Sequence, residues 1–327
     1  MTEKSMVVPV EAVGERLDRW LSGILMDLSR SRIQGLIKCG DILVDGRPVK
    51  AHAALQEGAV VTVRIPAPVA PPELVAEDIP LTVLYEDEDI VVIDKPAGLV
   101  VHPGAGNRAG TLVNALLHRC GPLPGIGGEL RPGIVHRLDK GTSGVMVAAK
   151  SERAMASLAK QFRERKVSKE YLAVVWGKLR PSRGRIETLL GRSRRDRKKM
   201  STHAGSGRAA VTLYETTEVF ERMSLVRVRI ETGRTHQIRV HMSFKGCPVV
   251  GDDTYGRRRA AGKDLPVKAE RPMLHAEKLA LKHPVSRTLM EFMAPLPADM
   301  MTLLETLRAG PRVDEVVRRD RGAKRRR

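Results

Sequence analysis

Apolar residues near the start of the chain predict two short helices. They recur at helical spacing across residues 15–27, at Leu17, Trp20, Leu21, Ile24 and Leu25. A second helix is expected over residues 31–40, which Ser29 or Ser31 can cap and Gly40 can end.

A small β unit is expected to follow these helices. Asp45 and Gly46 form a dipeptide typical of a two-residue hairpin. Residues 60–65 alternate apolar and polar side chains like a strand. The proline-rich run PAPVAPP at 66–72 then indicates a semi-extended linker.

The larger remainder of the chain is predicted to be mostly strands. Helical spacing is confined there to residues 111–119 and 151–165, whereas strand-like runs follow one another at 169–177, 209–220 and 224–232. Consecutive strands without crossover helices favour an α+β fold with a mixed, largely antiparallel central sheet. The predicted parts are an N-terminal extension (1–14), a small α+β domain (15–66), a linker (67–78), a large domain (79–307) and a basic tail (308–327).

Charge is the first feature to bear on function. The 327 residues include 57 Lys and Arg against 38 Asp and Glu, a net charge of +19. Such an excess favours a phosphate backbone as partner, because Lys and Arg displace its condensed counterions. Two segments concentrate it: the run GRSRRDRKKM at 191–200, which includes Arg194 and Arg195, and the tail ending RRDRGAKRRR. We expect the tail to be disordered, and both segments to contact RNA.

Cysteine and hydropathy patterns point to a soluble cytoplasmic protein. Cys39, Cys120 and Cys247 are too few and too far apart for a disulfide framework or a structural zinc site. The chain contains neither a signal-peptide-like start nor an apolar run of about 20 residues, so we expect no membrane association.

One acidic residue stands out as a candidate nucleophile. In GIVHRLDKGTSGVMVAAK (133–150), Asp139 lies between Arg137 and Lys140, before a buried strand. Nearby cations favour the ionised form of a carboxylate, and an ionised Asp in a loop can attack an electrophile. By itself this pattern also fits an ordinary surface ion pair.

Residues 15–66 resemble the S4 RNA-binding domain. The order RLD, then SRIQ, then GDILVDGRPV carries the likeness across residues 15–66. The resemblance implies that basic side chains of the two helices and the hairpin face RNA, namely Arg16, Arg19, Arg30, Arg32, Lys38 and Arg47.

Residues 80–300 resemble the RluA family of pseudouridine synthases. HRLDKGTSG (136–144) is similar to the catalytic motif, KEYLAVVWG (169–177) supplies a tyrosine, and ETGRTHQIRVHM (231–242) resembles a third motif. The subgroup acting on large-subunit ribosomal RNA is the most similar. Gly141, where that subgroup usually has an acid, and Asp253, where proline is common, depart from it.

The resemblance implies a fold, a reaction and roles. A uridine of large-subunit ribosomal RNA or of a pre-ribosomal particle would flip out and be isomerised by Asp139, which attacks either the base or the sugar. Arg239 would pair with Asp139, and Tyr171 would stack on uracil. Other substrate contacts would come from Lys95, His136, Arg137, Thr142 and Ile238. An isomerisation implies no cofactor and no metal, and we expect a monomer.

Two alternatives remain at this point. GAGNRAG (104–110) lies between a strand and a helix like a dinucleotide-binding loop, but it lacks the GxGxxG spacing and Pro103 interrupts its approach. The S4-like module and the basic tail would also suffice for a non-catalytic ribosome-assembly factor.

Finally, His136, His236 and His241 lack the spacing of a helical metal-ligand pair, which favours hydrogen-bonding structural roles.

Overall fold

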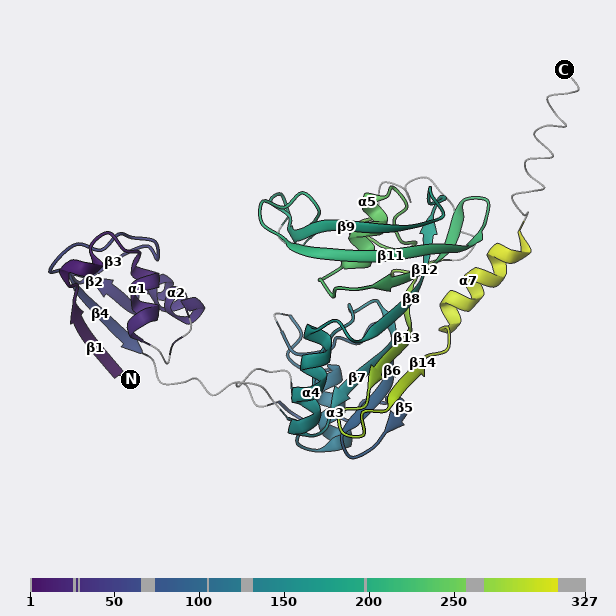
Figure 1. Ribbon diagram of the computed structural model, residues 1–327, viewed down its shortest axis with the longest axis horizontal. Coiled ribbons are helices and arrows are strands. Elements are labelled where there is room, and N and C mark those ends of the chain that lie inside the picture. The colour runs from purple at the N-terminus through teal and green to yellow at the C-terminus, as the bar shows by residue number, and fades with distance from the viewer. Residues whose placement is uncertain are drawn as a thin grey trace, which may run out of the picture. The chain divides into compact units, whose positions relative to one another are not determined.

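The computed structural model describes residues 2–25, 28, 30–65, 74–104, 106–124, 132–196, 199–256 and 268–310. It divides into two compact units, residues 1–73 and 74–327, each described here by itself (Figure 1). The expected tail (308–327) lies outside the described residues from 311 onward, and so does the whole proline-rich run at 66–72.

The first unit packs two helices on a four-stranded sheet. Its helices are α1 (Leu17–Ile24) and α2 (Arg30–Cys39), with a short 3-10 turn, η1 (Val10–Ala12). The sheet order is β1-β4-β2-β3, formed by β1 (Thr2–Val7), β2 (Ile42–Val44), β3 (Arg47–Pro48) and β4 (Val60–Ile65). The predicted hairpin is confirmed: Asp45 and Gly46 connect β2 to β3, both with positive φ, as a primed turn requires.

The strand β1 was not expected. Residues 1–14 were predicted to be an extension outside the small domain, yet Thr2–Val7 pairs antiparallel with β4 from Thr2↔Ile65 to Val7↔Val60. The segment gives a weak hydrophobic signal because it is an edge strand whose described side chains are all exposed or only partly buried. The sheet therefore begins almost at the first residue.

The second unit is built on a ten-stranded sheet, ordered β10-β9-β11-β12-β8-β13-β7-β6-β5 with β14 pairing β13. Among these neighbours only β13 and β7 run parallel, so the predicted mixed, largely antiparallel sheet is confirmed. The strands are β5 (Thr82–Glu86), β6 (Ile90–Lys95), β7 (Ser143–Ala149), β8 (Ser168–Trp176), β9 (Arg183–Arg192), β10 (Met200–Ser201), β11 (Arg208–Val219), β12 (Met223–Ile230), β13 (Leu274–Lys282) and β14 (Leu289–Met293).

Helices cover both faces of this sheet, because alternate side chains of each strand point to opposite sides. On one side, α3 (Leu112–Cys120) and α5 (Gln237–Phe244) share a core with Val91 and Ile93. On the other, α4 (Glu152–Arg163) packs on Ile90 and Val92. The last helix, α7 (Ala298–Ala309), was not predicted, and it buries Leu303 and Leu304 against β8 and β12.

Candidate active site

The loop that carries Asp139 is fixed from several directions. Its backbone closes a turn, in which the Thr142 N–H donates to the Asp139 carbonyl at 3.0 Å. The Gly98 N–H and Lys95 Nζ both donate to the Lys140 carbonyl, at 2.8 and 3.4 Å. Arg271 Nη1 donates to the next carbonyl, that of Gly141, at 3.1 Å. The carbonyls of Asp139, Lys140 and Gly141 are therefore all bonded within the protein.

Gly144 connects this loop to the buried strand β7. It has a φ of +115°, and a Cβ there would lie 2.2 Å from the Ala276 carbonyl oxygen in the adjacent strand β13. This is the point where β7 and β13 run parallel. Only glycine permits so close an approach of the two backbones, which fixes the direction in which the loop leaves the sheet.

Asp139 pairs with a buried arginine that is itself held by a second carboxylate. Arg239 Nη1 donates to Oδ2 of Asp139 at 3.1 Å, while Nε and Nη2 bind the two oxygens of Asp252 at 2.7 and 2.9 Å. The Asp252 side chain is fully buried and also accepts the N–H groups of Thr254 and Tyr255. Burial opposes the charge on Arg239, but the two carboxylates outweigh it and raise the pKa of Arg239. The guanidinium is therefore oriented before any substrate arrives.

His236 is a further neighbour of Asp139. Its Nε2 lies 3.9 Å from Asp139 Oδ2, and its Nδ1 is 2.8 Å from the Tyr255 hydroxyl. It takes the left-handed conformation, with φ of 56°, immediately before α5. Burial lowers the pKa of His236 although Asp139 acts in the opposite direction, which favours a neutral ring. The expected hydrogen-bonding role is present, but at the edge of the candidate site.

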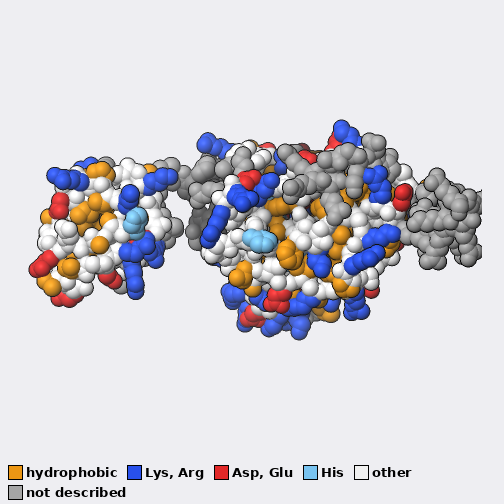
Figure 2. Space-filling view, turned by 90° about the horizontal axis from the view of Figure 1, so that it is seen from above, with side chains coloured by type: hydrophobic (Ala, Val, Ile, Leu, Met, Phe, Trp, Pro, Cys, Tyr) orange, Lys and Arg blue, Asp and Glu red, His pale blue; other side chains and the backbone are white. Residues whose placement is uncertain are grey.

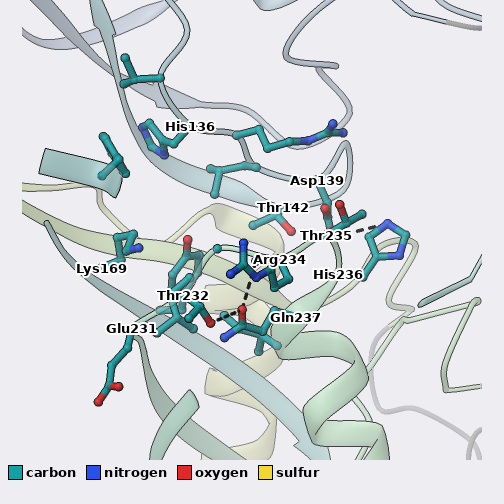
Figure 3. A pocket seen from close by; sticks show the side chains of 18 of the residues that line it. His136, Asp139, Thr142, Lys169, Glu231, Thr232, Arg234, Thr235, His236 and Gln237 are labelled. Atoms are coloured by element: carbon teal, nitrogen blue, oxygen red, sulfur yellow. Dashed lines mark hydrogen bonds and ion pairs between the residues drawn. The ribbon is translucent and has the colours of Figure 1, made fainter. Parts of the chain in front are cut away.

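A pocket of about 640 Å³ opens beside Asp139. That is within the range of small-molecule sites and has room for a single nucleotide. In Figure 3, Asp139 and His236 lie on one side of the pocket and Lys169 and His136 on the other. Of the site residues expected from the sequence, the pocket brings together Asp139, Tyr171, Arg239, His136, Arg137, Thr142 and Ile238.

Lys95 was expected to contact substrate, and the structure contradicts this. Its side chain is fully buried and does not line the pocket. Its Nζ donates to the carbonyls of Pro96 at 2.7 Å, Leu99 at 2.9 Å and Lys140 at 3.4 Å. An ammonium has three hydrogens, so all of its donors are used inside the protein. Burial, assisted by the charge of Arg271, lowers the pKa of Lys95 to about 8.

Two ring side chains of the pocket have their protonation states set by the fold. Burial, and then the charge of Asp139, raise the pKa of Tyr171, so its phenol stays neutral near pH 7. His136 Nε2 accepts the N–H of Val147 at 3.1 Å, and the ring stacks on Phe162 with centroids 4.6 Å apart. Since a protonated ring could not accept that bond, His136 is neutral, in agreement with burial lowering its pKa.

Lys169 was missed by the sequence analysis. It lies two residues before Tyr171 on β8, so both side chains point to the same face of the strand, and it lines the pocket although only 9% exposed. Arg163, Arg165 and Arg234 line the same pocket. Asp252 and Lys169 could not be singled out from sequence, because nothing distinguishes them from their charged neighbours until the chain folds.

In the first unit, two of the expected RNA contacts are tied to one buried carboxylate. Arg16 binds both oxygens of Asp18 at 3.0 Å, and Arg30 binds Oδ2 at 3.1 and 3.2 Å. Each arginine still exposes about half of its side chain (51% and 49%). Arg19, Lys38 and Arg47 are exposed, whereas the side chain of Arg32 lies outside the described residues.

The surface agrees with the basic composition. Arg194 and Arg195 of the expected RNA-contacting loop are exposed, next to β9 and β10. Figure 2 shows Lys and Arg side chains distributed over the visible face of each unit. In the described part of the chain, no three His, Cys, Asp or Glu side chains are grouped so as to hold a metal ion, and no helix has the length and hydropathy of a membrane span.

Comparison with known proteins identifies both units. The sequence profile of a family described as RNA pseudouridylate synthase matches residues 89–244, and that of the S4 domain matches residues 15–61. An RNA pseudouridine synthase of Chloroflexus aurantiacus is 50% identical over 93% of this chain and 94% of its own length. A Xanthomonas campestris protein named ribosomal large subunit pseudouridine synthase D is 44% identical over 97% and 96%. The structure of human RNA pseudouridylate synthase domain containing 4 aligns with a TM-score of 0.55 at 30% identity, covering 69% of this chain and 93% of that one.

Proposed function

This chain belongs to the RNA pseudouridylate synthase family, and on that premise we propose that it isomerises uridines of large-subunit ribosomal RNA through the carboxylate of Asp139. The enzyme class follows from the family. The nucleophile and the target RNA are the additional claims, and each has its own support.

The observation that carries the choice of nucleophile is the pairing of Asp139 with Arg239 at the edge of the pocket. The carboxylate keeps 18% of its side-chain surface exposed, while the arginine that pairs with it is buried and fixed by Asp252. Arg239 Nη1 donates to the carboxylate at 3.1 Å, and the held guanidinium limits the rotation of the Asp139 side chain. An oriented carboxylate open to a nucleotide-sized pocket is suited to covalent attack.

The reaction balances without an oxidant or reductant. The bond from uracil N1 to ribose C1′ breaks, the base turns, a bond forms between C5 and C1′, and the C5 proton is lost while N1 gains one. Asp139 forms a transient bond to either the base or the sugar carbon, and that bond breaks again before the product leaves, which regenerates the carboxylate. Because these atoms are covered in a stacked helix, the nucleotide must flip into the pocket.

Other pocket residues then bind and orient the base. We propose that the Tyr171 ring stacks on uracil and that Ile238, which is 4% exposed, forms part of the apolar wall. His136 and Thr142 line the same pocket, and we propose that they also contact the bound nucleotide. Arg137 is exposed at the rim, where a guanidinium can fill the gap left by the flipped nucleotide or bind its phosphates.

The target is proposed from charge and from relatives. The +19 net charge and the S4 unit favour a structured RNA partner. The Xanthomonas campestris relative, 44% identical over nearly its whole length, is named for the large ribosomal subunit. We propose that this chain acts on the same class of RNA, free or in a pre-ribosomal particle, as a cytoplasmic monomer that needs no cofactor.

Chemical labelling of pseudouridine in ribosomal RNA tests this assignment. RNA from cells with and without the gene is labelled and mapped at single-nucleotide resolution. We expect one or more sites in the large-subunit RNA to disappear without the gene and to return when it is restored. Unchanged labelling throughout that RNA, with sites lost from another RNA, would contradict the proposed target and leave the enzyme class intact.

A further inference from the structure

The side of the pocket away from Asp139 holds an ammonium group without a counter-ion. Lys169 is 9% exposed, and the described residues offer its Nζ neither a carboxylate nor a hydrogen-bond acceptor. Its Nζ lies over the ring of Phe162, 5.8 Å from the ring centroid, in a cation–π contact. Burying an unpaired charge costs free energy, so a residue kept in this state points to a partner that arrives with the substrate.

The surrounding groups add positive charge and almost no negative charge. Burial, and then the nearby charge of Arg165, lower the pKa of Lys169 to about 8. Burial, followed by Arg208 and Arg165, also lowers the pKa of Arg234. Among the described residues, the acid that lines this part of the pocket is Glu231, and it accepts a bond from Arg185 Nη1 at 2.8 Å.

We propose that Lys169, Arg165 and Arg234 form a phosphate subsite that binds one phosphodiester group next to the flipped uridine. A uracil carbonyl would satisfy a single donor and leave the converging charges uncompensated, whereas a phosphodiester supplies a full negative charge and several acceptor oxygens. The position also fits, because Lys169 and Asp139 lie on opposite sides of a nucleotide-sized pocket (Figure 3).

This inference rests on the proposed function and extends it. It assigns the base to the Asp139 and Tyr171 side of the pocket and the backbone to the Lys169 side. Lys169 is then a binding residue for the RNA strand, with no part in bond making. Removing its charge should weaken RNA binding and leave the chemical step intact.

The test uses the full-length enzyme and a synthetic RNA stem-loop that contains a uridine it converts. The variant Lys169→Met removes the ammonium but keeps the length of the side chain. We expect KM to rise roughly ten- to hundredfold, as for loss of a charge-assisted hydrogen bond, and kcat to stay within about threefold. Lys169→Arg should recover most of the loss. Lys178→Met is the matched control, because Lys178 is exposed just beyond the other end of β8, roughly 30 Å along the chain.

A second set of measurements identifies the ligand as a phosphate. Single methylphosphonate groups, which are uncharged, replace each phosphate flanking the target uridine in turn. One position should raise the KM of the wild-type enzyme about tenfold and have little further effect on Lys169→Met. Arg165→Met, at an exposed position, provides the same comparison if Lys169→Met does not fold, and a weaker coupling to the same phosphate is expected.

Three results would overturn the subsite: an unchanged KM for Lys169→Met, a fall in kcat alone, or methylphosphonate effects equal in variant and wild type. Each of them leaves the wild-type activity in place. If the wild-type enzyme converts no uridine in any ribosomal RNA, the proposed function fails instead, so the two failures are distinguishable.

Discussion

Arg239 donates a hydrogen bond from Nη1 to Oδ2 of Asp139 across 3.1 Å, although the two residues lie 100 positions apart in the sequence. The arginine comes from α5 and the carboxylate from the loop before β7. Asp252 binds the Nε and Nη2 edge of the guanidinium. Of the side chains of Asp139, Arg239 and Asp252, that of Asp252 alone is completely buried. The arrangement therefore depends on a residue that never reaches the pocket.

We predict that Asp252→Asn slows catalysis without weakening RNA binding. An amide can still accept the N–H groups of Thr254 and Tyr255, but it cannot accept both guanidinium bonds, so Arg239 loses its fixed orientation. Misplacement of about 1 Å can cost roughly a hundredfold in rate, and we expect kcat to fall about 10- to 100-fold with KM within about threefold. Steady-state kinetics check this, with Asp253→Asn, at the exposed neighbouring position, as control. A rise in KM alone would show that Asp252 acts on RNA.

The variant Lys95→Met tests whether Lys95 supports the catalytic loop, as its hydrogen bonds indicate, and does not contact substrate. Loss of Nζ leaves the carbonyls of Pro96 and Leu99 without this donor and removes the weaker of two donors to the Lys140 carbonyl, at a cost of about 1–3 kcal/mol in the free energy of unfolding. The loop after Asp139 should also loosen, so kcat should fall while KM stays nearly constant. Denaturant unfolding and kinetics measure the two effects. A stable variant with a raised KM would instead restore the original expectation of substrate contact.

The pH dependence of kcat/KM should have a basic limb set by Lys169. Its pKa is lowered from 10.5 to about 8, and the cationic form is the one that binds phosphate, so kcat/KM of the free enzyme should fall as pH rises through about 8. Lys95 also has a pKa of about 8, so the variant Lys169→Arg decides between them. Arginine keeps its charge, and the limb should move to higher pH. If the basic limb of Lys169→Arg stayed near pH 8, the titrating group would be one other than Lys169.

In the first unit, low pH should reduce the stability of the fold by protonating Asp18. Its bonds to Arg16, Gln34 and Arg30 lower the pKa of the buried carboxyl from its ordinary value of 3.8. A lowered pKa stabilises the fold at pH values above the unfolded value, and that contribution is lost as pH falls below about 4. Asp18→Asn should lower the free energy of unfolding of this unit by about 1–3 kcal/mol at pH 7 and flatten its acid dependence. An unchanged acid profile in thermal unfolding would contradict the role of this cluster.

The sequence could predict the elements whose local pattern agrees with their packing. The Asp45-Gly46 hairpin, the helix at 111–119 and the antiparallel sheet all follow from turn chemistry and periodicity. Edge strand β1 and helix α7 were missed, since an edge strand buries little and α7 depends on contacts with β8 and β12. Motif resemblance named Asp139, Tyr171 and Arg239, and the structure places all three at one pocket.

What the sequence could not provide is the set of long-range partners. Residues 238–240 alternate like a strand taken alone, yet they form part of the buried helix α5. Lys95 was expected to face substrate, but its Nζ is bonded by carbonyls of the loop that directly follows it and by that of Lys140, 45 residues away. Asp252 and Lys169 have no local sequence signal. Asp252 matters because it binds the distant Arg239, and Lys169 because no described carboxylate pairs with it, and both facts depend on the folded structure.

The most direct test of the account is the single-turnover rate of Asp139→Asn on a ribosomal RNA substrate. Asparagine keeps the size of the side chain and removes the negative charge, so the fold and RNA binding should persist while conversion falls at least about ten-thousandfold. Thermal unfolding and RNA affinity measured on the same preparation serve as controls. Conversion by the folded variant at a rate near that of the wild type would contradict the central claim that the Asp139 carboxylate carries out the isomerisation.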